Sequence, residues 1–254
     1  MGNLIRMDLY RMWKTRPFYI CLILYAVLAL VGAPLEKVLF MLAGSLSNAA
    51  FETTRDIAGI ISNPFPMMGL MLILISVCFF FYADVENGYI KNIAGQMPMK
   101  GFTILSKFAA AFVHNLVFIV TGIVGNIIGQ LLVRQIVADG NIADSFRLLF
   151  LQLFLVQSLC AILLLVISTF RSKSLGMILA VLFGLGLTSL LYLAINSGLS
   201  QLFGGKEINI SEYMPDSVMG ERPLDTVKAI LVAAVTTGIF LPLAIRIFDR
   251  KDVK

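Results

Sequence analysis

The sequence has few charged residues for its length. Asp, Glu, Lys and Arg make up 14% of its 254 residues, whereas 59% of the residues are hydrophobic. Soluble domains contain about 25% charged residues, so this chain has too few charges to cover so large an apolar fraction in water. A lipid bilayer accepts apolar side chains directly, and about 20 consecutive ones carry a helix across it. The composition therefore predicts an all-α membrane protein.

Groups that carry catalysis or bind metals are also scarce. The single histidine, His114, is predicted to be a hydrogen-bonded helix-packing residue, or alternatively part of a transport path. Cys21, Cys78 and Cys160 lie in apolar stretches at unrelated spacings, which is typical of small buried hydrophobes. There is no phosphate-binding loop, since the segment 205–207 (Gly-Lys-Glu) lacks the hydroxyl residue and the upstream glycine. We therefore expect no enzyme activity and no cofactor or metal bound by this chain, and its scattered basic residues predict no nucleic-acid partner.

Six stretches lack charge for long enough to cross a bilayer. They are 17–35, 57–83, 108–133, 148–170, 174–205 and 229–245. None has a carboxylate or a basic residue well inside it, which argues against proton- or sodium-driven transport. The fifth is too long for one straight crossing, so we expect it to bend after a straight helix that stops near Gly198, Gly204 and Gly205. One domain, residues 1–254, with six transmembrane helices is the predicted architecture.

The Lys and Arg residues predict the orientation of these spans. They are most frequent before residue 17, in 84–107, at 171–173 and after 245. Cytoplasmic segments carry an excess of Lys and Arg, so both termini are predicted to lie in the cytoplasm. On the outside, the apolar patch 38–46 within the segment 36–56 suggests a short interfacial helix.

The N-terminal segment 1–16 has the pattern of an amphipathic helix. Its apolar side chains share one arc of a helical wheel: Ile5, Leu9, Met12 and Trp13. Asn3, Arg11 and Lys14 fall on the opposite side. This pattern predicts a helix lying in the cytoplasmic membrane interface, with Trp13, Arg11 and Lys14 as its anchors. The alternative is a merely basic flank that sets the topology of the first span.

The third stretch carries a row of polar and small residues. Asn115, Asn126 and Gln130 fall on one side of it, and Gly125 and Gly129 form a G-x-x-x-G on the same helix. Two interpretations remain open for this side of the helix. Small residues allow a second helix to approach closely, and amide side chains can instead line a translocation surface.

The segment 84–107 joins the second stretch to the third and carries the most informative motif. Seven of its residues form the pattern: Glu86, Asn87, Gly88, Lys91, Asn92, Lys100 and Lys107. This pattern resembles the cytoplasmic loop of ABC-2 type permeases, the membrane subunits of one class of ATP-binding-cassette transporter. Met99 stands where many members of that family have a small residue in the turn. The amphipathic N-terminus and the six spans are similar in outline.

The resemblance implies a permease subunit of a bacterial plasma-membrane exporter. A separate ATPase subunit would bind ATP and Mg, and a second permease copy or a paralogue would complete the path. The implied substrate is an amphipathic or antimicrobial peptide, or a hydrophobic small molecule. A short coupling helix over 89–96, ended by Pro98, would contact the ATPase through a set of loop residues: Glu86, Gly88, Tyr89, Lys91, Asn92, Pro98 and Lys100. The alternatives are a plain solvated connector and, for the whole chain, a structural or sensory membrane subunit without transport activity.

Overall fold

The computed structural model describes residues 2–47, 55–66, 68–86, 101–133, 136–137, 141–202, 209–221 and 224–250. The helices are α1 (Gly2–Lys14), α2 (Arg16–Ser47), α3 (Ile57–Ser62), α4 (Gly69–Glu86), α6 (Phe102–Val133), α7 (Ile142–Phe170), α8 (Lys173–Gly184), α9 (Thr188–Leu202), the 3₁₀ turn η1 (Ile210–Tyr213), α10 (Pro215–Gly220) and α11 (Thr226–Arg250). The strands β1 (Arg55–Asp56) and β2 (Ile136–Val137) form one short parallel pair. The predicted all-α class is confirmed for the described residues.

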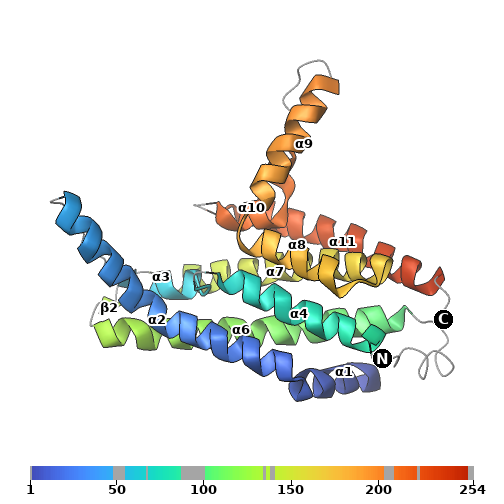
Figure 1. Ribbon diagram of the computed structural model, residues 1–254, viewed down its shortest axis with the longest axis horizontal. Coiled ribbons are helices and arrows are strands. Elements are labelled where there is room, and N and C mark those ends of the chain that lie inside the picture. Colours follow the sequence, from blue (N-terminus) through green and yellow to red (C-terminus); the bar gives the residue numbers. More distant parts are fainter. Residues whose placement is uncertain are drawn as a thin grey trace.

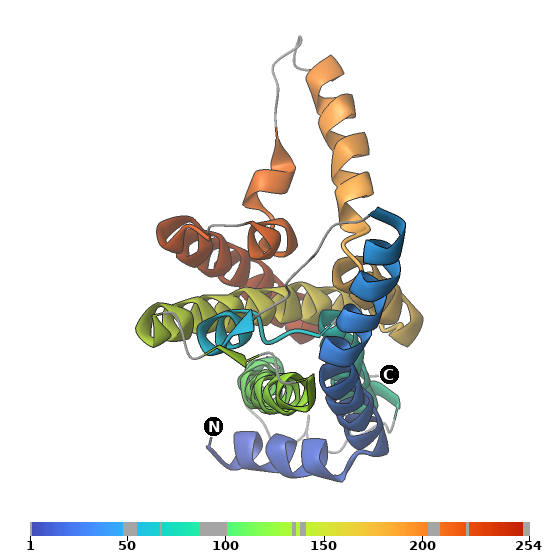
Figure 2. The ribbon, with the colours of Figure 1, turned by 90° about the vertical axis from the view of Figure 1, so that its left-hand side faces the viewer.

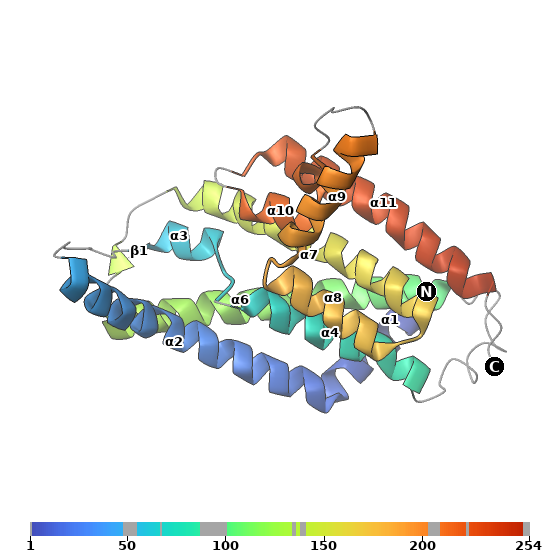
Figure 3. The same ribbon diagram turned by 45° about the horizontal axis from the view of Figure 1, so that its top comes forward.

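The long helices run side by side along one axis. Figure 1 shows α2, α4, α6, α7, α8 and α11 as a bundle, with α11 packed along α7, α2 along α6 and α4 along α8. In Figure 2 α9 stands away from this bundle, as it does in Figure 1. Figure 3 shows the short helix α3 beside α7. The end of α4 and the start of α6 lie at the same end of the bundle as α1 and the end of α11 (Figure 1).

Three of the described helices are long and apolar enough to cross a membrane: α6, α7 and α11. Counting each bent helix pair as one span gives up to five candidates, whereas the sequence predicts six. Their outward faces carry large apolar side chains, such as the ridge of Leu116, Val120, Val124 and Ile128 on α6, all more than 40% exposed. Such a surface suits lipid rather than water. The helices are consistent with a multi-pass membrane protein.

The second predicted span is divided in two. Instead of one helix over 57–83, α3 ends at Ser62 and α4 begins at Gly69. Pro64 and Pro66 lie in the break, and proline lacks the backbone N–H and clashes with the preceding turn of a helix. The hydropathy of this stretch is continuous, but its backbone is not.

The fifth predicted span bends earlier than expected. The helices α8 and α9 meet at about 90°, and the turn between them contains Gly186 at a φ of 68°. This left-handed conformation is one that glycine adopts readily. The prediction that the straight helix stops near Gly198 is wrong, because Gly198 lies inside α9. Gly204 and Gly205 lie outside the described residues.

The helix ends also differ from the sequence prediction. The helix α2 continues through Pro34 to Ser47, so residues 38–46 belong to the same helix as the first predicted span and do not form a separate helix. The helix α6 begins at Phe102 and takes in the last six residues of the predicted coupling loop. The helix α7 begins at Ile142, where the side chain of Asn141 accepts a hydrogen bond from the N–H of Ala143 and caps the helix.

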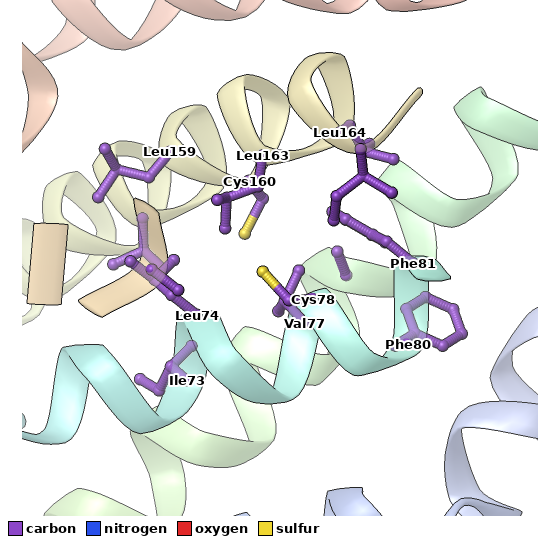
Figure 4. Close-up of a cluster of buried hydrophobic side chains, with 14 of the residues drawn as sticks. Ile73, Leu74, Val77, Cys78, Phe80, Phe81, Leu159, Cys160, Leu163 and Leu164 are labelled. Atoms are coloured by element: carbon purple, nitrogen blue, oxygen red, sulfur yellow. The ribbon is translucent and has the colours of Figure 1, made fainter. Parts of the chain in front are cut away.

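The buried core draws on most of the long helices, and one part of it lies where α4 meets α7. Figure 4 shows Leu74 of α4 and Leu159, Cys160 and Leu163 of α7 in one cluster of buried side chains. The sulfurs of Cys78 and Cys160 point into the same space (Figure 4). All three cysteines are free and buried, which confirms the prediction that they are small buried hydrophobes.

Candidate functional site

Several polar contacts lie at the end of the bundle where α4 ends and α6 begins, which we call the loop end. Lys107 of α6 is only 3% exposed there. Its Nζ donates hydrogen bonds to the carbonyl oxygens of Phe80 and Phe81, at 3.3 and 3.2 Å. It also lies 5.1 Å from the centre of the Phe80 ring. A cation near the C-terminus of a helix is favoured by the helix dipole, so Lys107 fastens the start of α6 to the last turns of α4.

A second contact at the loop end joins α4 to α8. Lys173 Nζ lies 3.8 Å from the Glu86 carboxylate and 4.3 Å from the centre of the Phe79 ring. The Glu86 side chain is 59% exposed. Exposed ion pairs contribute at most about 1 kcal/mol, so this contact orients Glu86 more than it stabilises the bundle.

Gly101, which directly follows the segment 87–100, is held by the last turn of α11. The backbone N–H of Gly101 donates a hydrogen bond to Oδ1 of Asp249 at 2.6 Å. A Cβ on Gly101 would lie 2.6 Å from Cγ2 of Ile245 and 2.9 Å from Oδ2 of Asp249. The absence of a side chain at Gly101 therefore lets the start of α6 approach α11.

The N-terminal helix is fixed to the loop end by a buried carboxylate. Ser106 donates a hydrogen bond to Oδ2 of Asp8 at 2.5 Å, and both residues are at most 1% exposed. Arg11 lies 3.8 Å from the other carboxylate oxygen of Asp8. A hydrogen bond to a charged acceptor is stronger than one between neutral groups. The helix α1 thus packs on α6 through a polar contact as well as through Met12.

The predicted interfacial helix 1–16 corresponds to α1 (Gly2–Lys14), which meets α2 at an angle of 64°. Its predicted anchors lie towards the outside. Trp13 is 41% exposed and packs edge-on against Phe18, and Lys14 lies 4.8 Å from the centre of the Tyr10 ring. These positions suit residues at a membrane surface. Arg11 differs from the other two anchors, because Asp8 holds it.

Of the predicted coupling residues, Glu86 is described and lies exposed at the end of α4. The others, and the predicted coupling helix 89–96, lie outside the described residues: Gly88, Tyr89, Lys91, Asn92, Pro98 and Lys100. The structure therefore describes the two anchored ends of this segment.

The three residues predicted to line a translocation surface are covered by other parts of the same chain, or bond to them. Asn115 is fully buried, and its amide nitrogen donates to Oε1 of Gln157 on α7 at 3.0 Å. Asn126 donates to the carbonyl oxygen of Pro64 at 3.4 Å, and Gln130 is 4% exposed. A role in translocation would require α6 to separate from these neighbours.

His114 lies in the middle of a polar chain that crosses the core. Its Nε2 is 2.9 Å from the hydroxyl of Ser76 on α4, and its Nδ1 is 3.3 Å from Oδ1 of Asn115. Asn115 continues the chain to Gln157, which in turn donates to the carbonyl oxygen of Phe108 at 2.7 Å. The chain joins α4, α6 and α7, which agrees with the prediction of a hydrogen-bonded packing residue.

The G-x-x-x-G of α6 serves helix packing in this structure. A Cβ on Gly125 would lie 2.6 Å from the Cβ of Ala29, and one on Gly129 would lie 2.6 Å from the carbonyl oxygen of Leu30. Small residues at this spacing let two helices approach closely. The helix that uses this close approach is α2.

The sequence interpretation missed Asp8, Gly101 and Asp249, although the two carboxylates each leave a signal. Asp8 falls beside Met12 on the apolar arc of α1, where a charge is out of place unless it has a buried partner. Asp249 stands in the last turn of α11, where the helix dipole disfavours a carboxylate. Neither signal identifies the partner, because Ser106 and Gly101 are each about a hundred or more residues away.

No group of three or more His, Cys, Asp or Glu side chains in the described part of the chain is arranged to hold a metal ion. Comparison of the chain with protein-family models and with curated proteins gives no match.

Proposed function

We propose that this chain is the membrane-spanning subunit of an ATP-driven exporter, and that the segment 84–107 couples it to a separate ATPase subunit. The observation that carries the proposal is that the C-terminal end of this segment, residues 101–107, is fixed by polar contacts to three other helices. Lys107 ties it to α4, Asp249 of α11 holds Gly101, and Asp8 of α1 holds Ser106.

A firm attachment of this kind is what a coupling segment needs. A soluble partner that closes on ATP can move transmembrane helices only if the segment it pushes is stiffly joined to them. At the loop end, Gly101 and the first two turns of α6 contact α1, α4 and α11. The last turn of α4 contacts α8. A plain solvated connector has no need of the buried polar contacts that Ser106 and Lys107 make at the C-terminal end of this segment.

The arrangement of the chain ends supports a common cytoplasmic side. The segments predicted to be cytoplasmic from their Lys and Arg content meet at the loop end, since Asp8, Glu86, Gly101, Lys173 and Asp249 all make contacts there. We propose that this end faces the cytoplasm of a bacterial cell, with both termini inside. The proposed topology has six crossings, in which α3 and α4 together make the second and the bent pair α8 and α9 contributes the fifth.

The proposed substrate is an amphipathic or antimicrobial peptide, or a hydrophobic small molecule, and a second permease copy or a paralogue completes the path. Asn115, Asn126 and Gln130 would be exposed to substrate when α6 moves away from its neighbours. ATP and Mg would bind to the ATPase subunit. The proposal rests on the loop contacts and on the resemblance of the segment 84–107.

The experiment has two parts. The chain, tagged at its C-terminus and purified from its native membranes, is expected to capture an ATPase subunit. Vesicles that contain the complex are then expected to move a fluorescent cationic peptide in an ATP-dependent manner. Failure to capture an ATPase, or flux that is independent of ATP, contradicts the proposal. Capture of other membrane proteins without flux favours a structural or sensory subunit.

A scrambled loop tests the coupling role directly. Scrambling residues 89–99 is expected to abolish ATP-dependent flux and ATPase capture. Scrambling residues 48–54, predicted to lie on the opposite side of the membrane, is the matched control and is expected to leave capture intact. If the chain with residues 89–99 scrambled still captures the ATPase and transports at the normal rate, the coupling role is wrong.

A further inference from the structure

A large apolar cavity opens between α6, α7 and α11. Its volume is about 660 Å³, within the range of roughly 300–1,000 Å³ that is usual for ligand sites. Phe108, Ala109 and Phe112 form the α6 wall. The other walls come from α7 and α11: Phe154, Gln157, Ile230, Ala233, Ala234 and Thr237.

The helices that form this cavity indicate whether it opens to lipid or to water. They belong to the three described helices that are each long and apolar enough to cross a membrane unaided. Phe154 and Ile230 are 51% and 50% exposed, and so mark the open side, whereas Ala233 is 6% exposed and lies deep. A cavity that opens sideways between membrane spans meets hydrocarbon rather than water.

The lining decides which part of a molecule fits inside. Water needs several polar partners to remain in a cavity, and seven of the nine lining residues are apolar. Gln157, one of the two polar ones, already bonds Asn115 through Oε1 and the Phe108 carbonyl through Nε2. The cavity therefore suits a hydrocarbon chain and provides no charged group for a lipid head group.

The size of the cavity argues against a helix as the occupant. A helix with its side chains is about 10–12 Å wide and rises 1.5 Å per residue, so each residue takes up more than about 100 Å³. The cavity would hold only about six such residues, whereas a bilayer-spanning helix has about 20. A flexible acyl chain is thin enough to enter between α6 and α11.

We propose that this cavity binds one acyl chain of a membrane phospholipid, which enters sideways from the bilayer. The bound chain fills the space between α6 and α11 and holds the two helices apart at this level. The inference does not depend on the proposed transport function, because it needs neither ATP nor a second subunit.

The test uses a phospholipid with a photoreactive diazirine in the middle of one acyl chain. The purified chain is reconstituted in vesicles that contain this lipid, irradiated and mapped by peptide mass spectrometry. The label is expected to concentrate on residues 108–112 of α6 and 230–237 of α11. The exposed ridge of α6 around Val120 and Val124 is expected to be labelled only at the background level of lipid-facing residues.

Two substitutions fill the cavity, and one neighbour serves as a control. Ala234→Trp and Thr237→Phe are expected to abolish the concentrated label, whereas Val235→Trp, on the 56% exposed outer face of α11, leaves it in place. Thermal unfolding midpoints that are equal for the three variants show that the fold is retained. If Ala234→Trp unfolds, the result for Thr237→Phe decides the test. The inference is overturned if the labelling simply follows the exposure of each residue, or if it survives in both filled variants. Crosslinking of this cavity to a second copy of the chain instead of to lipid would also overturn it.

Discussion

The carboxylate of Asp249 accepts a hydrogen bond at 2.6 Å from the backbone N–H of Gly101, a residue 148 positions earlier in the chain. The contact joins the last turn of α11 to the residue immediately before α6. It therefore closes the bundle at the loop end, where the segment proposed to contact an ATPase returns to the membrane helices.

Removing the Asp249 carboxylate is expected to destabilise the loop end. Asp249→Ala leaves the N–H of Gly101 without its charged acceptor, and a hydrogen bond to a charged group contributes about 1.5–3 kcal/mol. We expect the free energy of unfolding in detergent to fall by about that amount. Asp249→Asn keeps an oxygen acceptor and is expected to lose less. Equal stability of the alanine and asparagine variants would show that the acceptor is unimportant.

The contact between Asp8 and Ser106 is expected to show strong coupling in a double-mutant cycle. Because both residues are buried, we expect Asp8→Ala and Ser106→Ala to have non-additive effects, with a coupling energy of about 1–3 kcal/mol. Trp13 is the only tryptophan of the chain and lies on α1, so its fluorescence reports the unfolding of that helix. Additive effects of the two substitutions would contradict a direct contact.

The close approach of α6 and α2 predicts different results for two identical substitutions. Gly125→Ala places a Cβ 2.6 Å from that of the buried Ala29, and such overpacking costs about 1–3 kcal/mol. Gly32→Ala on α2 meets nothing within 4 Å. It is expected to be neutral or to stabilise by about 0.5–1 kcal/mol, because alanine restricts the unfolded chain more than glycine does. Thermal unfolding in detergent compares them, and a smaller loss for Gly125→Ala than for Gly32→Ala would refute the packing role.

Asp216 is expected to hold η1 and α10 against the bend between α8 and α9. It accepts hydrogen bonds from Tyr192, at 2.9 Å, and from Thr188, and both donors are buried. Asp216→Ala is expected to speed amide hydrogen exchange in residues 209–220, consistent with a local loss of about 1–3 kcal/mol. Glu212→Ala, an exposed neighbour, is the control. Unchanged exchange in the Asp216 variant would rule out this role.

Much of the helical framework could be predicted from the sequence. Long apolar stretches gave α6, α7 and α11, and the wheel pattern of the N-terminus gave α1, because hydropathy and periodicity are local properties of a segment. The prediction of six transmembrane spans is less well supported by the structure. Pro64 and Pro66 interrupt the helix in one predicted span, and the chain turns at Gly186 in another. Prolines in an apolar stretch are visible in the sequence, but hydropathy alone does not show that they break it.

By itself, the amino-acid sequence determined that the chain forms apolar helices and which end of each helix carries the basic residues. Side-chain chemistry decides both, whatever the neighbours are. Only the tertiary structure decided that Lys107 bonds the backbone of α4, that Asp8 meets Ser106 and that Asp249 meets Gly101. Such pairings depend on how helices far apart in the chain pack against one another, and a polar residue in an apolar stretch shows that it needs a partner without showing which one.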